Sequence, residues 1–246
     1  MTYRALLLCA LLAATPAFAS ESAHWSYGGE GGPDHWGDLD PAFAACKDGR
    51  MQSPIDLGAA NERATVQVQV SYKPVPLTVL HNGHTVQFNV DNGSAITLAG
   101  ISYKLLQVHF HTPSEHKDHG VSYPLEAHFV HKSDQGALAV IGVLFKPGAP
   151  SKALEPLLAH LPTTQTPPVT YDKASMHFEG LLPAKRQLVR YMGSLTTPPC
   201  SEGVNWMVMQ DTMTASQAQI DQLAKAMGDN ARPLQAPDHR LIVAPK

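Results

Sequence analysis

Two closely spaced histidines and a third one further along the chain could together bind a metal ion. His109 and His111 stand in an extended apolar run in which residue types alternate. Alternate side chains of a β-strand point to opposite faces, so these two imidazoles share one face while Val108 and Phe110 take the other. His128 lies in a second run of the same kind. If the two runs pair in one sheet, three imidazoles converge on one point.

Three neutral imidazoles and one open position are the usual ligand set of a catalytic zinc ion. Gln107 precedes His109 by two residues, and Glu126 precedes His128 in the same way, so each stands on its ligand's face. Hydrogen bonds from such partners fix the tautomer of a ligand and raise its basicity. The alternative is that these are solvated strand histidines, since the chain has 13 histidines. The complete set of three ligands with two partners favours zinc.

The first residues of the chain are typical of an export signal. Arg4 precedes an apolar run, from Ala5 to Ala14, that is too short to span a bilayer, and Ala17-Phe18-Ala19 fits a small-x-small cleavage site. We therefore predict a secretory signal peptide over residues 1–19 and an exported domain over residues 20–246. The protein would be periplasmic or secreted, with no membrane anchor.

Charge and cysteine content narrow the function further. The formal net charge is −3 and the charges are not clustered, which argues against a nucleic-acid partner. Once the predicted signal is removed, only Cys46 and Cys200 remain, and two cysteines in an oxidising compartment indicate one disulfide. Two buried thiols are the alternative.

The elements that position these residues are predicted to be mainly β, with a few surface helices. Ser151 could cap a short helix over residues 152–160, and Thr214 could cap a longer one that ends at Met227, before Gly228. Alternating apolar residues between turn signals predict strands over residues 66–71, 77–80, 85–90, 96–98, 103–111, 125–130 and 137–145.

Five short motifs then stand in a familiar order. They are QSPID at 52–56, NGH at 82–84, QVHFHTPSEH at 107–116, PLEAHFVH at 124–131 and GSLTTPPC at 193–200. With them the chain resembles an α-class carbonic anhydrase, and specifically the bacterial exported branch, from about His24 to Lys246. The resemblance implies a single domain around a large, twisted, mostly antiparallel sheet with a few short surface helices.

The resemblance also implies a function and a set of site residues. One zinc ion would be held by His109, His111 and His128, and a zinc-bound hydroxide would convert carbon dioxide reversibly to bicarbonate and a proton. Thr196 matches the family's gatekeeper threonine, which donates to the residue that matches Glu115. The remaining matches are Thr197 near bound substrate, the apolar carbon dioxide wall of Val130, Val140, Leu195 and Trp206, and the disulfide of Cys46 with Cys200.

His84 matches the proton shuttle of the family, and Tyr27, Asn82 and Gln87 match residues that order water between metal and shuttle. The chain has Thr112 and Gln87 where many animal members have Trp and Asn, and both variants fit the bacterial branch. Without the resemblance, His84 would be interpreted as a solvated turn residue. The family pattern also allows a homodimer.

Two other functions compete with this hypothesis. A cupin-type oxygenase also has His-x-His followed by Glu, but the flanking glycines and the later glycine-rich motif of that class are missing here. Such an enzyme would contain iron or manganese. The second alternative is an exported zinc buffer or binding module, which would bind several metal ions per chain. The complete ligand set favours the enzyme.

Overall fold

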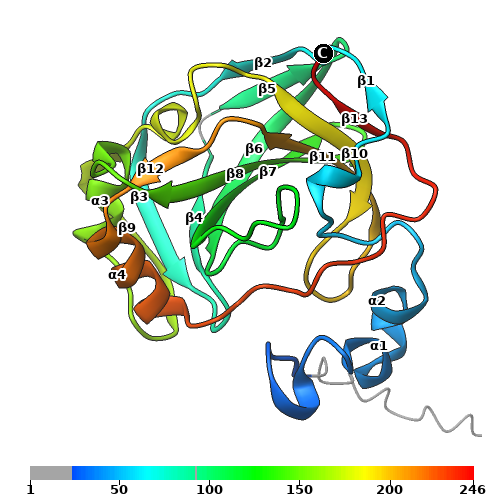
Figure 1. Ribbon diagram of the computed structural model, residues 1–246. Coiled ribbons are helices and arrows are strands. Elements are labelled where there is room, and N and C mark those ends of the chain that lie inside the picture. Colours follow the sequence, from blue (N-terminus) through cyan, green and yellow to red (C-terminus); the bar gives the residue numbers. More distant parts are fainter. Residues whose placement is uncertain (1–23, 92) are drawn as a thin grey trace, which may run out of the picture.

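A sheet of thirteen strands runs through residues 24–91 and 93–246, which are the residues that the computed structural model describes (Figure 1). The predicted signal peptide, residues 1–19, lies outside them. The strands are β1 (Glu62–Arg63), β2 (Val68–Ser71), β3 (Val75–His81), β4 (Val86–Asn89), β5 (Ala95–Leu98), β6 (Ile101–His111), β7 (Leu125–Ser133), β8 (Leu138–Pro147), β9 (Thr166–Met176), β10 (Leu188–Ser194), β11 (Glu202–Met209), β12 (Met213–Ala215) and β13 (Ile242–Ala244).

The main path of the sheet has the order β1-β13-β10-β11-β8-β7-β6-β4-β3-β9, with β2, β5 and β12 attached at its sides. The pairs β8 with β11, β8 with β12 and β1 with β13 are parallel, and the other pairs are antiparallel. The predicted mainly β, mostly antiparallel fold is thus confirmed. The seven predicted strands coincide with β2 to β8, whereas β1 and the strands after β8 were not predicted.

Strands β6, β7 and β8 form the centre of the sheet. Apolar residues alternate in β6, and β7 is buried on both faces over most of its length, because packed layers cover it on each side. A bulge in β6 between Leu105 and Gln107 shifts the register against β7. After this bulge the register sets His109 directly opposite His128. The bulge therefore decides which residues of the two strands meet.

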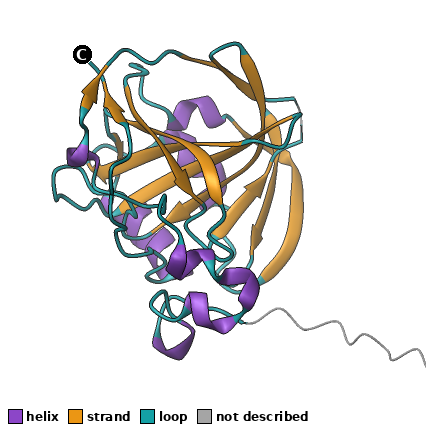
Figure 2. Ribbon diagram, turned by 90° about the vertical axis from the view of Figure 1, so that its right-hand side faces the viewer, coloured by secondary structure: helices purple, strands orange, loops and turns teal. Residues whose placement is uncertain are grey.

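Two apolar clusters cover the sheet. The larger contains Phe88, Phe110 and Phe129 together with residues of the surface helices. The smaller contains Val140, Tyr191 and Trp206. Figure 2 shows the helices at the periphery of the strands. None of the helices among the described residues combines the length and the apolar character needed to cross a membrane.

The predicted helix over residues 152–160 is shorter in the structure. A 3-10 turn over Lys152–Leu154 leads into α3 (Glu155–Leu158). Ser151 makes no side-chain cap, so that part of the prediction is wrong. Its backbone N–H and C=O instead bind the side chain of Gln219, at 2.8 and 2.9 Å. A distant glutamine has replaced the local cap.

The longer helix, α4 (Gln217–Met227), begins later than predicted. Thr214 belongs to strand β12 and is not the cap. Ser216 is the cap: its Oγ accepts from Gln219 N at 3.2 Å, while Gln219 Oε1 accepts from Ser216 N at 3.0 Å. This reciprocal pair is a capping box. Gly228 ends the helix with a φ of 67°, as its position predicted.

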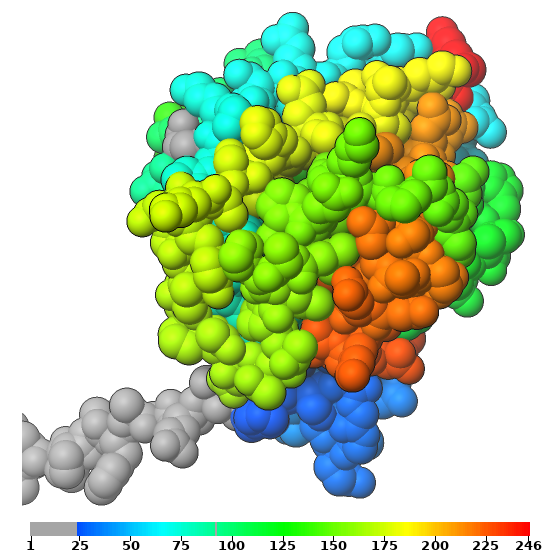
Figure 3. Space-filling view, turned by 90° about the vertical axis from the view of Figure 1, so that its left-hand side faces the viewer, coloured from blue at the N-terminus to red at the C-terminus, as the bar shows by residue number. Residues whose placement is uncertain are grey.

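The N-terminal arm packs at one end of the molecule. It carries α1 (Trp36–Leu39) and α2 (Ala45–Asp48), which lie on the opposite side of the molecule from α4 in Figure 1, and Figure 3 shows the arm in blue at the lower end of the molecule. The rings of Trp25, Tyr27 and Trp36 contact one another edge to face, with centroids 5.2 to 5.8 Å apart. These aromatic contacts give the arm a small core of its own, which includes Cys46 and Cys200.

Candidate metal centre

The three predicted ligands come together on β6 and β7. The ring centroids of His109, His111 and His128 are 4.5 to 5.1 Å apart, and their candidate ligand atoms all lie within 4.8 Å of one another. His111 and His128 are almost fully buried, and His109 is half-buried. Alternation along β6 and direct pairing with β7 are sufficient to bring the rings to one point.

Each ring uses one nitrogen to donate a hydrogen bond. His109 Nδ1 lies 2.8 Å from Gln107 Oε1, and His128 Nε2 lies 2.8 Å from Glu126 Oε1. His111 Nδ1 lies 2.7 Å from the backbone oxygen of Asn230. All three partners are acceptors, so these nitrogens carry the protons. The lone pairs therefore stand on Nε2 of His109, Nε2 of His111 and Nδ1 of His128.

The electrostatics of the rings fit a bound zinc ion. Burial lowers the pKa of all three imidazoles, and that of His111 falls to about 4, so the rings are neutral at pH 7. His111 Nε2 is buried and has no hydrogen-bond partner in the described part of the chain. A buried acceptor without a partner is costly, and a metal ion would satisfy it. Neutral nitrogen ligands of this number are those that zinc prefers.

Glu115 lies directly beside this cluster and is buried. Its Oε1 accepts from the backbone N–H of Arg232 at 2.9 Å, while Oε2 lies 3.6 Å from His111 Nε2 and 3.9 Å from His128 Nδ1. Burial raises the pKa of Glu115 to about 7, against the opposing effects of His128, the Arg232 N–H and the Thr196 hydroxyl. A divalent cation in the cluster would favour the carboxylate form.

Thr196 stands on the loop between β10 and β11, buried beside Glu115. Its hydroxyl is among the groups that lower the pKa of Glu115, although Oε2 itself has no hydrogen bond of good geometry in the described residues. Leu195 N binds Ser201 O at 3.0 Å, and Cys200 N binds Thr197 O at 2.8 Å. These bonds and the disulfide of Cys200 to Cys46 hold the loop. The predicted disulfide is present.

Glu126 connects the metal cluster to a second pair of buried groups. Its Oε1 accepts from His128 and from His116 Nδ1, at 2.8 and 2.7 Å, and Oε2 accepts the backbone N–H groups of Glu115 and His116. Burial opposes its ionisation, yet His116 and His128 hold the pKa of Glu126 well below its usual range. The triad of His116, Glu126 and His128 thus bonds internally, which argues against a second metal ion there.

The predicted apolar wall forms a row across three neighbouring strands. Val130 pairs with Val140, and Val140 pairs with Trp206 in the parallel ladder. The Trp206 ring lies 4.8 Å from that of His128. Leu195 packs on the same apolar cluster from the loop. The register of the sheet therefore sets an apolar surface directly against a ligand.

His84 lies apart from the three ligands, in a hollow formed with the N-terminal arm. Its ring stacks on Trp25 with centroids 3.7 Å apart and an interplanar angle of 9°, and His24, Asn82 and Asp229 line the same hollow. Burial is the main cause that lowers the pKa of His84, followed by the nearby His24 and His81. The ring is a neutral imidazole at pH 7.

The residues predicted to order water occupy three different environments. Asn82 uses its Oδ1 to accept the N–H groups of His84 and Thr85, each at 2.9 Å. Gln87 pairs with His109 across β4 and β6 and donates to Asn89. Tyr27 is close enough to Glu115 for that carboxylate to raise the pKa of its hydroxyl, although burial is the larger cause.

Sequence reasoning missed the segment that follows α4. Asn230 is fully buried: its backbone oxygen holds His111, and its side chain binds the backbone of Thr112, Phe110 and His84. Arg232 supplies the N–H to Glu115. Both contacts use backbone atoms far along the chain from their partners, so no residue pattern could have indicated them.

Known proteins resemble the chain over nearly its whole length. Residues 31–246 match the family model described as "Eukaryotic-type carbonic anhydrase". A carbonic anhydrase from Pectobacterium atrosepticum is 39% identical over 240 residues, which is 97% of this chain and 97% of the relative. A hyperthermostable carbonic anhydrase from an active hydrothermal vent chimney has a TM-score of 0.87 and 43% identity, covering 91% of this chain and 100% of its own. For the Photobacterium profundum α-carbonic anhydrase the values are 0.84 and 45%, with 89% and 100% covered.

Proposed function

Since the chain belongs to the eukaryotic-type, or α-class, family of carbonic anhydrases, whose reaction is the reversible hydration of carbon dioxide, we propose that it catalyses this reaction with one zinc ion held by His109, His111 and His128. The observation that carries the proposal is the hydrogen bonding of these rings. Each donates from one nitrogen, and each directs a free lone pair from the other into the same space.

Bound zinc would supply a Lewis acid that makes a hydroxide nucleophile available from water at neutral pH. The contribution of the chain is to keep all three ligands neutral, so that they do not reduce the charge of the metal. Burial does this by lowering the pKa of each imidazole. Gln107, Glu126 and Asn230 hold the tautomers in which the correct nitrogens are free.

Glu115 and Thr196 would orient the nucleophile. An ionised Glu115 can only accept hydrogen bonds, so the Thr196 hydroxyl donates to it. The threonine oxygen is then left to accept a hydrogen bond from the nucleophile, which aims a lone pair of the nucleophile at the substrate carbon. The burial of both residues beside the ligands supports this assignment.

Carbon dioxide is apolar and is best held by an apolar surface. We assign this to the row of Val130, Val140 and Trp206 with Leu195, because it lies against His128. Thr197, which is half-buried at the adjoining loop, would meet bicarbonate. The wall would exclude water from one side of the carbon dioxide position and leave the other side open to the nucleophile.

The proton produced in each turnover must leave the site. His84 is the proposed carrier, because a neutral imidazole in an open hollow can accept a proton and release it to buffer. Tyr27, Asn82 and Gln87 are proposed to order the intervening water. The disulfide agrees with an oxidising compartment, and we propose export to the periplasm or outside the cell, directed by residues 1–19.

Metal analysis joined to stopped-flow hydration tests the proposal. The purified protein should contain about one zinc ion per chain, and His111→Ala should lose both tight zinc binding and activity, because a ligand is removed. His239→Ala, at an exposed position, is the matched control and should keep both. Iron or manganese in place of zinc, several zinc ions per chain, or full activity in His111→Ala would each contradict it.

A further inference from the structure

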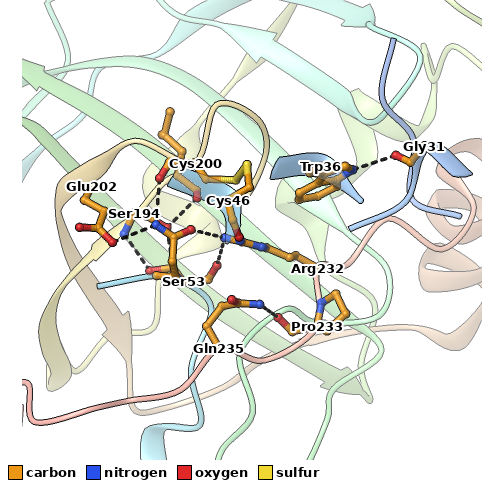
Figure 4. Close-up of a disulfide and its surroundings, with 12 residues drawn as sticks. Gly31, Trp36, Cys46, Ser53, Ser194, Cys200, Glu202, Arg232, Pro233 and Gln235 are labelled. Carbon is orange, nitrogen blue, oxygen red and sulfur yellow. Dashed lines mark hydrogen bonds between the residues drawn. A yellow bond between two sulfur atoms is a disulfide. The ribbon is translucent and has the colours of Figure 1, made fainter. Parts of the chain in front are cut away.

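One buried arginine contacts the metal centre with its backbone and the disulfide region with its side chain. Arg232 is only 2% exposed, and its N–H donates to Glu115 Oε1. Its Nη1 donates to Gln52 Oε1 and Ser53 O at 2.8 and 2.9 Å, and its Nη2 donates to Cys46 O at 2.9 Å. The guanidinium also lies 5.6 Å from the centre of the Trp36 ring, and Figure 4 shows it beside the disulfide.

The same two residues, Gln52 and Ser53, also hold the loop that carries Thr196. Ser53 and Ser194 exchange two hydrogen bonds, from Ser53 N to Ser194 Oγ at 2.9 Å and from Ser194 N to Ser53 Oγ at 3.1 Å. Gln52 Nε2 donates to Cys200 O at 3.1 Å. Ser194 and Cys200 flank the loop. The Gln52–Ser53 segment is therefore the common support of the Thr196 loop and of Arg232.

A buried guanidinium needs a reason, because burying a charge is costly. Burial lowers the pKa of Arg232 to about 10, and each oxygen that its side chain contacts is neutral. These acceptors come from three positions, Cys46, Gln52 and Ser53, and only the planar fork of arginine presents several donors in a fixed geometry. The arrangement favours a geometric requirement over an ion pair.

We propose that Arg232 is a positioning residue: its guanidinium binds the Gln52–Ser53 segment and so keeps the Glu115 carboxylate correctly placed relative to the Thr196 hydroxyl. The inference rests on the proposed function, because the relative position of Glu115 and Thr196 matters for the rate only if these two residues orient a nucleophile. A shift of Glu115 relative to Thr196 would let the threonine proton point elsewhere. The residue acts through Glu115 and touches no reactant.

Arg240 is a matched control. It is 8% exposed, donates to Gln52 O at 2.8 Å, and lies 5.6 Å from the centre of the Tyr191 ring. Its own N–H bonds to Pro237 O, and its side-chain bonds within the described residues go to backbone oxygens outside the metal centre. Arg240 thus binds the Gln52–Ser53 segment at one backbone oxygen, but its own backbone binds Pro237 where that of Arg232 binds Glu115, so Arg240→Lys should leave Glu115 in place.

The kinetic test is a double-mutant cycle on kcat/KM for hydration, with the zinc content measured for each variant. Lysine keeps the charge but presents its donors from one point, so Arg232→Lys should lower kcat/KM by about 10-fold, at the lower end for groups that support a metal site. Arg240→Lys should remain within about 2-fold, because the backbone N–H of Arg240 bonds to Pro237 O and makes no link from the Gln52–Ser53 segment to Glu115. In a Glu115→Gln background, Arg232→Lys should cost about 2-fold or less, because coupled residues are not additive.

A second readout does not need zinc or turnover. In the zinc-free protein, the backbone amide proton resonance of Arg232 reports the hydrogen bond to Glu115, and Glu115→Gln should move it upfield. Gln52→Ala removes one acceptor of the guanidinium and leaves residue 232 unchanged, so it should move this resonance in the same direction. Arg240→Lys should leave it in place.

Equal losses of kcat/KM in Arg232→Lys and Arg240→Lys, additive losses with Glu115→Gln, or an Arg232 resonance that ignores Gln52→Ala would each overturn the inference. If Arg232→Lys does not fold, Gln52→Ala replaces it in the cycle. A wild-type protein with no hydration activity would refute the proposed function, and the amide resonance would still decide whether Arg232 positions Glu115.

Discussion

At the scale of single residues, the position of one proton on each imidazole determines what the site can bind. Glu126 accepts a hydrogen bond from Nε2–H of His128, whereas Gln107 and the backbone of Asn230 accept from Nδ1–H of His109 and His111. Exchanging these tautomers would point N–H groups at the cation position. We therefore expect these partners to contribute to metal binding along with the proposed ligands.

The hydroxyl of Thr196 should matter for rate and not for metal binding. Thr196→Ala should retain zinc and lower kcat/KM by roughly 10–100-fold, the range for losing a group that supports a metal site. Thr196→Ser keeps the hydroxyl and is the matched control, expected to stay close to wild type. Zinc analysis and stopped-flow hydration provide the measurement. An alanine variant as fast as wild type would show that this hydroxyl does not orient the nucleophile.

His84 should matter for turnover and not for the carbon dioxide step. His84→Ala should lower kcat in dilute buffer and leave kcat/KM unchanged, because proton release follows the chemical step. Added imidazole buffer should restore kcat. Since burial lowers the pKa of His84, the ring stays neutral into more acidic solution. The midpoint of the wild-type kcat profile in dilute buffer should therefore lie below the ~6.5 of an ordinary imidazole.

The His84 prediction has two informative failures. A variant with wild-type kcat at every buffer concentration would show that protons leave by another route. A variant with reduced kcat/KM at every buffer concentration would show that the substitution has damaged the site itself.

At the scale of elements, neighbouring strands place whole rows of side chains. Strands β7, β8 and β11 bring Val130, Val140 and Trp206 into one row, and the neighbouring strand β6 adds His109 and His111. The sheet path ends at an edge strand, which must be kept from pairing with strands of other chains. Strand β9 lies at that end and carries Pro167 and Pro168, which cannot donate to a further strand.

Helix α4 gives a test of capping. Ser216→Ala should lower the free energy of unfolding by about 1 kcal/mol, because an orphan helical N–H loses its acceptor. For a protein of this size, that corresponds to a fall in Tm of roughly 2–4 °C. Thr214→Ala is the control from β12 and should lower Tm less. Thermal unfolding measures both, and a larger effect at Thr214 would place the cap where the sequence pattern suggested.

At the scale of the whole molecule, the N-terminal arm is attached to the catalytic side by several separate contacts. The Cys46–Cys200 disulfide joins α2 to the Thr196 loop across a separation of 154 residues. Trp25 stacks on His84, and Arg232 binds Cys46 and Ser53. The arm therefore packs directly against residues of the proposed site.

Loss of the disulfide should therefore reduce global stability. In the chain-entropy model, a cross-link over so long a loop contributes up to ~5 kcal/mol, so reduction should lower Tm. A variant with both Cys46→Ser and Cys200→Ser should show the lower Tm with or without reductant. Alkylation after denaturation should find no free thiol in unreduced protein. Two alkylated cysteines in exported material would contradict the bond.

The sequence by itself determined the chemistry that is written in residue types and short spacings. His109 and His111 share a face because a strand alternates, and Gln107 and Glu126 stand two residues before their ligands for the same reason. Strands β2 to β8 followed from apolar alternation, and Gly228 marked the end of α4. These features are local, so pattern reasoning could predict them.

Only the tertiary structure decided which distant groups complete the site. The oxygen of Asn230 on His111, the N–H of Arg232 on Glu115 and the stacking of His84 on Trp25 join segments far apart in sequence. Two of these contacts use backbone atoms, which every residue type possesses, so they leave no signature in the sequence. Which backbone atom arrives at a given place is set by packing of the whole sheet and its loops.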